Sequence, residues 1–566
     1  MEIILFTIFV VAVIGLGIYQ GNKTSGDSEG GGASGYFLAG RGLTWWLVGF
    51  SLIAANISTE QFVGMSGQAA DHLGMAIASY EWMAAITLVV VAFIFLPKFL
   101  KAGIYTAPEF LEYRYGLFSR MVMAIATLII LVGVPTASVI FSGAKVVSVY
   151  YPDVPLLGNL TSACWIIALI AAAYVFVGGL KACAWTDLVW GASLILGGAV
   201  VAWLAFQHLG NMDPATLAPT ATQKDVTVDQ LAQAGAFERF QMLNAGAAEV
   251  GGKLHMKRPL TDPDIPWTAL VLGLWIPNFF YWGLNQYIIQ RTLGSKSLAE
   301  GQKGIIFAAF LKLIVPFVVV IPGILAFNMF SAEMAKAGGG YDFDASFPLL
   351  LKNLIKPHPW ISWFVLAAIF GAVVSSLASM LNSASTIATM DLFHKVKPHA
   401  TEKQLVVTGK VFVVLFVVIA AIIAPFLANP KFGGIFTFIQ EFQGFVSPGV
   451  LAVFLFGVLV PRAPRFLGWS GIILNAVLYG LIKFSLADII VAKGLWFADS
   501  ISFLDRMGIC FIIVMIYCAV MTAVKPLPSP IILPENKAIN LDSSPIAKLT
   551  GAAVIVMTII LYIVFW

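Results

Sequence analysis

Charged residues are scarce in this sequence. Only 11% of its 566 residues are Asp, Glu, Lys or Arg, whereas soluble domains usually contain about a quarter. The four cysteines and six histidines are scattered, and the chain has no CxxC, HExxH or P-loop motif. Hydrophobic residues make up 59% of the chain, more than a single soluble core could bury. A lipid bilayer can accept that surface, so we expect an integral membrane protein.

Long apolar windows predict an all-α fold with about fourteen transmembrane helices, since about 20 apolar residues span a bilayer. The windows lie near 2–20, 43–66, 74–99, 118–145, 158–179, 184–207, 266–289, 303–329, 359–391, 404–427, 434–460, 466–485, 503–524 and 547–566. Their continuous apolar character is typical of helices and not of alternating barrel strands. The start Met1-Glu2 lacks the basic region of a signal peptide, so we expect the first window to be a retained helix.

The distribution of Lys and Arg predicts the orientation, because cytoplasmic loops are enriched in these residues. The loops after the odd-numbered windows hold most of them: Lys23, Arg41, Lys98, Lys101, Arg114, Arg120, Lys181, Arg291, Lys296, Lys303, Lys395, Lys397, Lys403, Arg462, Arg465, Lys525, Lys537 and Lys548. Both termini should therefore be extracytoplasmic. The hydrophilic segments 208–265 and 330–358 are expected to be external loops with a short helix or two, and Ser25–Ser34 a cytoplasmic loop.

Charged side chains inside membrane helices are costly, so each one is a candidate functional residue. The candidates are Glu60, Glu81, Asp187, Lys312, Asp391 and Glu441. The alternative is that some lie at the interface or form an ion pair between helices. Asp391, near the end of a window, fits this alternative as well as a functional role.

Two windows contain signals of a broken helix. The second includes the polar run from Asn56 to Gln61, and the seventh includes Pro277, Gly283 and Asn285. These windows begin two successive groups of five helices. Corresponding interruptions in two halves predict an inverted repeat with a binding site near the middle of the membrane.

The ninth window contains a polar stripe. Ser375, Ser379, Asn382, Thr386 and Thr389 follow steps of four and three residues, which places them on one helix face. Small hydroxyl residues also allow close helix packing, so part of the stripe could be structural. The stripe's length favours a face lined by water or ions.

These features together suggest binding of a hard cation and a polar solute. Sodium prefers several oxygen ligands, which a broken helix near 54–57 and the hydroxyls of Ser375 and Ser376 can provide. Amide, carboxylate and ammonium groups spread over several helices can surround a sugar with donors and acceptors.

Several long stretches resemble the sodium/solute symporters, a family that includes sugar carriers. They include Tyr36–Gly40, Ser51–Ser58, Ala78–Met83, Tyr281–Gly283, Asn285–Leu293 and Ser375–Ser383, and the similarity extends from about Gly35 to Pro461. The resemblance implies a five-plus-five inverted-repeat core like that of amino-acid transporters. It divides the chain into 1–42 (first helix and loop), 43–207 (first repeat), 208–265 (external loop), 266–460 (second repeat) and 461–566 (three further helices).

The resemblance also implies roles for individual residues. The sodium site would use the carbonyls of Ala54, Ile57 and Ala372 and the hydroxyls of Ser375 and Ser376. The sugar site would use Asn56, Gln61, Glu81, Asn278, Lys312 and Gln440. Tyr281 would be the inner gate, whereas Met65, Tyr80 and Phe436 would close the site from outside. Asp187 occupies a position that the family links to sodium coupling.

Two positions depart from the family pattern. Ala84 stands where a galactose carrier has a serine, so one sugar hydroxyl loses a partner. Ala378 stands where relatives that carry two sodium ions have a threonine, which predicts one sodium ion per cycle.

We therefore expect a symporter of the bacterial inner membrane that imports a galactose- or glucose-like hexose with sodium by alternating access, and for which a monomer suffices. The alternative within the same fold is another small polar solute: inositol, sialic acid, an amino acid or a vitamin. A channel would need a ring of selectivity residues, and an enzyme a nucleophile–base pair or metal cluster. The sequence displays none of these.

Overall fold

The computed structural model describes residues 2–23, 38–336, 338–429, 434–496, 498–536 and 539–566. Among these residues the chain forms helices and two isolated β-bridges, and no strand. In this part, nine helical runs are long and apolar enough to cross a membrane, and a bent pair and four shorter apolar helices add further segments. Each of the fourteen predicted windows overlaps one of them, which confirms the all-α membrane fold. The predicted loop Ser25–Ser34 lies outside the described residues.

The N-terminal half contains most of the shorter helices. Its helices are α1 (Glu2–Lys23), α3 (Trp45–Asn56), α4 (Ser66–Ala70), α5 (Ser79–Val90), α6 (Leu96–Ala102), α7 (Ala107–Tyr115), α8 (Leu117–Leu131), α9 (Ala137–Tyr150), α10 (Leu160–Asn211), α11 (Pro214–Leu217), α12 (Val228–Gln233) and α13 (Ala236–Asn244). Single π-helical turns join α5 to α6 at Val91–Phe95 and α8 to α9 at Val132–Thr136. Each pair therefore crosses the membrane as one run.

The C-terminal half completes the bundle. Its helices are α14 (Trp275–Leu284), α15 (Gln286–Leu293), α16 (Leu298–Met334), α17 (Ser346–Leu350), α18 (Pro359–Thr386), α19 (His394–Val396), α20 (Glu402–Ile423), α21 (Ile435–Gln443), α22 (Ser447–Leu459), α23 (Leu467–Leu481), α24 (Ala487–Ala492), α25 (Phe503–Val524) and α26 (Pro545–Phe565). Capping side chains define the starts of α16 and α20. Ser297 accepts a hydrogen bond from the Glu300 amide, and Thr401 forms a capping box with Gln404. The α21–α22 pair bends by 42°.

Both predicted helix breaks are confirmed. Helix α3 ends at Asn56, and Ile57 is extended, with φ −82° and ψ 106°. Asn285 is extended in the same way, with φ −76° and ψ 121°, and separates α14 from α15. The sequence suggested that Pro277 and Gly283 mark the second break, but neither residue lies at it. Pro277 lies in the first turn of α14, where proline is tolerated, and a Cβ on Gly283 would approach the Phe95 ring to 2.5 Å.

Helix α10 is longer than the sequence predicted. Its 52 residues contain both the fifth and the sixth window, which appear as the apolar segments Leu160–Val175 and Cys183–Asn211. The run contains no proline that would force an interruption.

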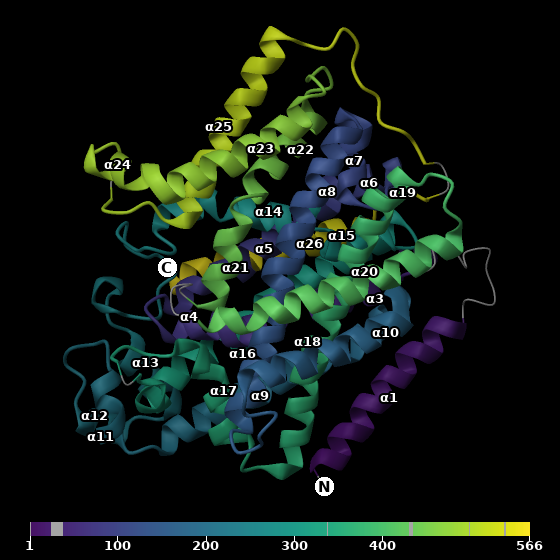
Figure 1. The fold of residues 1–566 in the computed structure, drawn as a ribbon. Helices are drawn as coiled ribbons and strands as arrows, with labels where there is room; N and C mark the ends of the chain where they lie inside the picture. The colour runs from purple at the N-terminus through teal and green to yellow at the C-terminus, as the bar shows by residue number, and fades with distance from the viewer. Residues whose placement is uncertain (1, 24–37, 337, 430–433, 497, 537–538) are drawn as a thin grey trace.

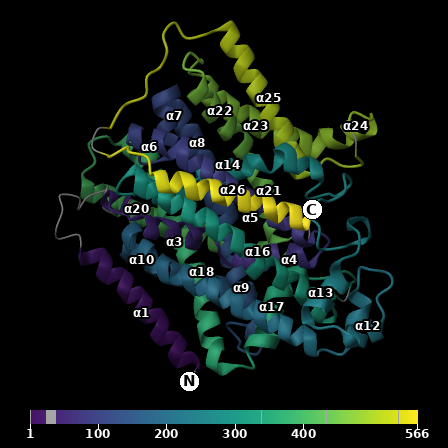
Figure 2. The same cartoon turned by 180° about the vertical axis from the view of Figure 1, so that it is seen from behind.

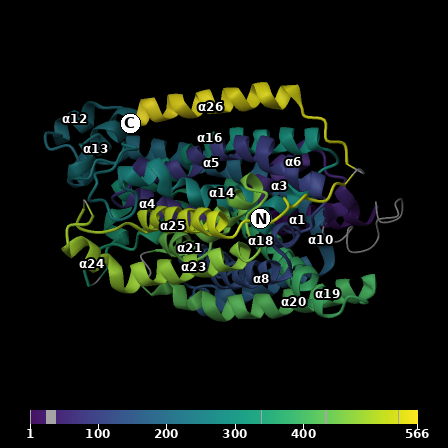
Figure 3. The same ribbon diagram turned by 90° about the horizontal axis from the view of Figure 1, so that it is seen from above.

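Helices α3, α5, α10, α16 and α18 pack together in the middle of the bundle (Figure 1). In the most apolar window of the α18 run, 83% of residues are buried, compared with 17% in α26. Figure 2 shows α26 crossing the face of the bundle, and Figure 3 places α26 and α20 along opposite edges. The peripheral helices therefore expose apolar side chains, while buried polar residues gather inside.

The hydrophilic segment 208–265 folds into α11, α12 and α13 beside the end of α16 (Figure 1). Its contacts with the membrane helices include two backbone hydrogen bonds. The carbonyl of Lys253 accepts a hydrogen bond from the Met75 amide at 2.7 Å, and the Met256 amide donates to the carbonyl of Phe565 at 2.8 Å. The segment thus packs on the start of the α5 run and on the end of α26.

Candidate functional site

The break in α3 releases backbone carbonyls for other partners. In a continuous helix the Ser58 amide would donate to the carbonyl of Ala54, but here it donates to Oε1 of Gln61 at 2.8 Å. The Ala54 carbonyl accepts hydrogen bonds from the hydroxyls of Ser375 and Ser376, each at 3.3 Å. The Ser376 hydroxyl also lies 3.3 Å from the carbonyl of Ala55.

Three members of the predicted sodium site, the Ala54 carbonyl and the hydroxyls of Ser375 and Ser376, therefore meet at one buried point between α3 and α18. Ala372 lies one turn before the two serines on α18, and Ile57 is the extended residue of the break; both are buried. The oxygens in reach are carbonyls and hydroxyls, which suit an alkali cation. No group of three or more His, Cys, Asp or Glu that could hold a metal ion occurs among the described residues.

Asp187 is the acid beside this point, and both of its oxygens are hydrogen-bonded. Oδ1 accepts from the Ser375 hydroxyl at 2.5 Å, and Oδ2 accepts from the Ser51 hydroxyl at 2.5 Å. Arg291 pairs with Oδ2 at 3.2 Å, and its other nitrogens donate to Ser51 and to the backbone carbonyl of Tyr287. The carboxylate is completely buried, and so is the guanidinium.

Arg291 corrects the sequence interpretation. We counted it among the positive charges of a cytoplasmic loop, but it lies in α15 and is fully buried. Arg114 and Arg120, counted in the same way, are also buried, and they bond to backbone carbonyls and carboxylates inside the protein.

The polar stripe of α18 has two parts with different partners. Its first part faces the break in α3 through Ser375 and Ser376. Further along, Ser379 accepts from Arg291, and Thr386 accepts from Nε2 of Gln290 at 3.2 Å. That second part joins α18 to α15 and is structural.

A polar cavity lies on the other side of the α3 break. Its space between atoms, opening included, is about 580 Å³. Its lining contains five of the six predicted sugar-site residues and three of the four predicted gate residues: Asn56, Gln61, Glu81, Asn278, Gln440, Tyr281, Tyr80 and Phe436. Met65 is fully buried and is not among the described lining residues.

Lys312 is the sixth predicted sugar-site residue, and it holds two lining side chains in place. Its ammonium lies 2.5 Å from Oε2 of Glu81 and also donates to Oδ1 of Asn56. It lies 5.1 Å from the centre of the Trp282 ring, which adds a cation–π contact. The amide nitrogen of Asn56 in turn donates to the Tyr281 hydroxyl at 2.8 Å. These bonds fix the donors and acceptors of one wall.

Aromatic rings form part of the cavity wall. Tyr281 receives a hydrogen bond from the Tyr287 hydroxyl at 2.7 Å, and their rings are nearly perpendicular. The Tyr80 and Phe436 rings, also in the wall, meet edge to face at 4.8 Å. A Cβ on Gly64 would approach the Phe436 amide to 3.0 Å, so glycine allows this helix to pack closely on α21.

Two of the charged candidates lie elsewhere. Asp391 forms a buried pair with Arg120 at 2.5 Å, and Glu441 bonds to Lys483 and Arg506, each at 2.9 Å. These are ion pairs between helices, the alternative that the sequence left open. Glu60, by contrast, lines the cavity.

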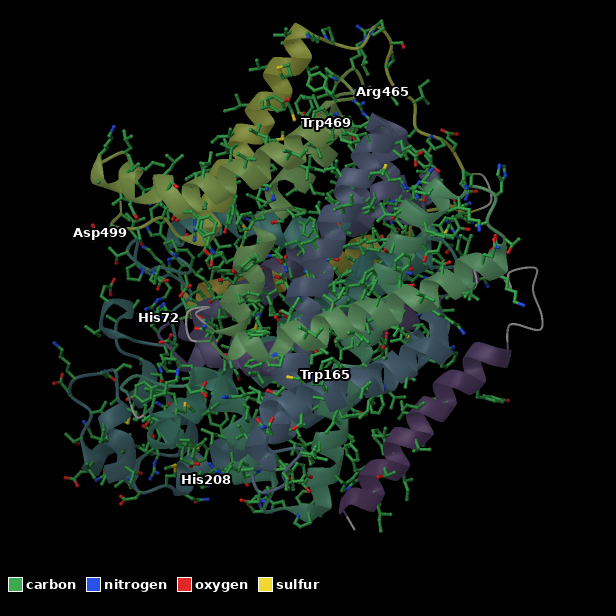
Figure 4. The ribbon with its side chains drawn as sticks, in the orientation of Figure 1. His72, Trp165, His208, Arg465, Trp469 and Asp499 are labelled. Atoms are coloured by element: carbon green, nitrogen blue, oxygen red, sulfur yellow. The ribbon has the colours of Figure 1, made fainter. Side chains whose placement is uncertain are left out.

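Outside the spans, a cluster of charges connects α4 to the segment 208–265. His72, which follows α4 (Figure 4), lies 3.5 Å from Asp262 and 3.4 Å from Asp71. Burial alone would lower the pKa of His72, but hydrogen bonds and attraction from these two carboxylates outweigh it and raise the pKa to about 10. The same contacts, with backbone amides, overcome burial at Asp262 and lower its pKa to about 2.

Comparison with known proteins extends these observations. The model of the Sodium:solute symporter family matches residues 36–473. The chain is 37% identical to a sodium/glucose cotransporter of Vibrio parahaemolyticus over 100% of this chain and 98% of that protein. It is 33% identical to the uncharacterized symporter YidK of Escherichia coli (strain K12), over 82% of this chain and 75% of that protein.

A solved structure is similar in fold. A sodium-coupled sialic acid symporter in its substrate-bound outward-open state matches with a TM-score of 0.68 and 20% identity. The match covers 94% of this chain and 99% of that one. The two chains thus share their fold over nearly their whole length.

Proposed function

The chain belongs to the sodium:solute symporter family, and from this premise we propose that it imports a galactose- or glucose-like hexose together with sodium. Membership makes it a multi-pass membrane transporter with sodium as the co-transported ion, and not an enzyme. The hexose is the finer part of the proposal. It is supported by the similarity over the full chain to a protein described as a sodium/glucose cotransporter.

The observation that favours a sugar most is the composition of the cavity wall. Amide and carboxylate groups from Asn56, Gln61, Glu81 and Gln440 line one cavity whose wall also contains aromatic rings. Amides offer both donors and acceptors, which matches the hydroxyls of a sugar. Tyr281 provides an aromatic face against which a sugar ring can stack.

Sodium binding at the α3 break would prepare this cavity. The break residues and the cavity residue Asn56 are consecutive, so an ion held by Ala54 and the α18 serines fixes the end of α3. We propose that sodium binds first from outside, that the sugar follows, and that Tyr80, Met65 and Phe436 close over it. The two repeats then rock, Tyr281 opens, and sodium leaves to the sodium-poor cytoplasm ahead of the sugar.

One sodium ion per sugar is enough for strong accumulation. Moving one charge through 100 mV provides about 2.3 kcal/mol. A tenfold sodium gradient adds about 1.4 kcal/mol. Together these support accumulation on the order of several hundredfold. Ala378, which has no hydroxyl to offer a second ion, supports this stoichiometry.

The remaining parts of the proposal concern topology. The range 43–207 forms the first repeat and 266–460 the second, with 1–42 before them, 208–265 between them and 461–566 after them. Both termini face away from the cytoplasm of a bacterial inner membrane, and a monomer carries out transport.

The test is uptake into proteoliposomes of labelled galactose or glucose, with an inward sodium gradient and a potassium gradient as control. Sodium-dependent accumulation of either hexose, competed by the unlabelled sugar, is the expected result. Inositol, sialic acid, amino acids and vitamins serve as competitors. Sodium-dependent uptake of one of these, without hexose uptake, would contradict the hexose assignment and leave sodium coupling intact.

A further inference from the structure

A groove beside α26 lies outside the site described above. Its space between atoms, opening included, is about 990 Å³. Helix α5, helix α26, the segment 208–265 and the chain leading into α14 contribute its lining, which consists of Met83, Ile86, Lys257, Trp267, Leu270, Val271, Trp275, Tyr562 and Trp566. Val271 is 69% exposed and Trp566 is 56% exposed. In a chain that spans a membrane, such exposed apolar side chains face lipid, so the groove opens toward the bilayer.

One end of this groove lies at the level where the membrane helices end. The Met256 amide donates to a carbonyl in the last turn of α26 at 2.8 Å, so the neighbouring Lys257 lies beside the end of α26, which is marked C in Figure 2. Trp566 directly follows α26, and Trp267 directly precedes the apolar run that leads into α14. Tryptophan at helix ends is typical of the membrane–water interface, where its ring lies at the level of the lipid head groups.

Lys257 provides an unpaired positive charge at this level. It lines the groove, is exposed, and forms no ion pair or hydrogen bond with its side chain in the part of the chain that the structure describes. Its neighbour Arg258 differs, because it is buried and pairs with Asp262 at 3.1 Å. The indole N–H of Trp267 also has no acceptor among the described residues. An ammonium and an indole N–H beside an apolar groove complement an anionic head group attached to an acyl chain.

We propose that this groove binds a phospholipid with a net negative head group, with the phosphate at Lys257 and Trp267 and one acyl chain along Leu270 and Val271. The inference does not depend on which solute the protein carries. An acyl chain gains little by leaving the bilayer for the groove, because lipid tails are as apolar as its side chains. The charge of Lys257 therefore selects the kind of lipid, and the shape of the groove sets its position.

Helix α5 separates this groove from the polar cavity. Tyr80 and Glu81 line the cavity, whereas Met83, two positions later, lines the groove. Trp82 lies between them, is fully buried, and has its ring centre 6.0 Å from that of Tyr562 in the groove wall. A lipid in the groove thus packs against the helix that carries part of the cavity wall. Because the unfolded chain has no such groove, the bound lipid should raise the melting temperature.

The expected preference follows from the attraction between one lysine and an acidic lipid. The intact protein should retain phosphatidylglycerol roughly fivefold better than phosphatidylcholine with the same acyl chains. Lys257→Gln removes the charge and keeps a polar side chain, so this preference should fall to about one. Val271→Trp fills the groove from its exposed side, so both lipids should be lost.

The experiment is native mass spectrometry of the full chain released from detergent micelles that contain both lipids in equal amounts. The quantity compared is the ratio of the two lipids retained by the monomer. Lys493→Gln is the matched control, because Lys493 is also exposed, directly follows α24, and does not line the groove. The control should keep the preference that Lys257→Gln loses. Phosphatidylglycerol should raise the melting temperature of the intact protein and of the control, and not that of Lys257→Gln.

Equal retention of the two lipids by the intact protein would overturn the inference. So would a preference that persists in Lys257→Gln, or one that Lys493→Gln loses to the same extent, since the second result would indicate surface charge in general. A dimer that disappears in Val271→Trp would assign the groove to a second copy of the chain instead. Leu270→Trp, read by the same ratio, gives the test if Val271→Trp does not insert.

Discussion

Replacing Lys312 by methionine should destabilise the protein strongly unless Glu81 is neutralised at the same time. The two side chains form an ion pair with an N–O distance of 2.5 Å and are 0% and 4% exposed. Methionine fills much of the same volume, so the perturbation removes the charge and leaves little empty space. It also removes the donor to Oδ1 of Asn56.

The magnitude can be worked from the geometry of the pair. At 2.5 Å, with an effective dielectric constant of about 20, the attraction is about 7 kcal/mol. Desolvating the two charges costs several kcal/mol each, so the intact pair adds little net stability. Removing one partner leaves the other charge buried alone, which costs about 3–5 kcal/mol. Lys312→Met and Glu81→Gln should each show this loss, and the double variant should lose no more than either single one.

The assay is reversible unfolding of the purified protein in mixed detergent micelles, applied to the double-mutant cycle. A coupling energy of at least about 3 kcal/mol is expected. The pair Lys303–Glu300 on the same helix is the matched control, with an N–O distance of 3.2 Å and exposed fractions of 33% and 21%. Its coupling should stay below about 1 kcal/mol. Additive losses for Lys312 and Glu81, no larger than in the control, would refute the reasoning.

Three further predictions concern other parts of the site. Ser376→Ala should raise the sodium concentration for half-maximal uptake about tenfold, because a ligand oxygen is lost. Ser385→Ala is the control and should leave that concentration unchanged, because the Ser385 hydroxyl donates to a backbone carbonyl of α20. An unchanged sodium dependence of Ser376→Ala would remove Ser376 from the site. Gln61→Ala should abolish sugar uptake in a protein that still inserts, so normal uptake would contradict its role. His72→Asn should lower the melting temperature most below pH 6.5, the ordinary pKa of histidine, since a raised pKa adds stability that is lost as the pH rises through about 10. A difference in melting temperature that stays constant between pH 5 and pH 10 would show that His72 adds no charge-dependent stability.

The membrane helices could be predicted from the sequence because the property that defines them is local. Bilayer thickness sets the length of a span, and hydropathy over about 20 residues reveals it. The breaks at Ile57 and Asn285 were visible for a similar reason, since polar residues interrupt an apolar run. The length of α10 was not visible, because a hydropathy minimum marks a less apolar segment whether or not the helix ends there.

The contacts within the site depend on residues far apart in the chain, so the sequence could not reveal them. Asp187 and Arg291 are 104 positions apart, and Lys312 and Glu81 are 231 apart. Composition suggested that each charge needed a partner but could not say which one.

The hydrogen bonds of the interior connect the predicted sodium site to the cavity without a gap. Asp187 accepts from a serine of the sodium site and pairs with Arg291, which donates to the backbone of Tyr287. The Tyr287 hydroxyl donates to Tyr281, and Tyr281 accepts from Asn56, the last residue of α3 before the break. The short segment around the break is therefore held on one side by the residues of the predicted sodium site and on the other side by the residues of the cavity. An ion that fixes one side reduces the freedom of the other, and reciprocity of binding requires a bound sugar to strengthen sodium binding by the same factor.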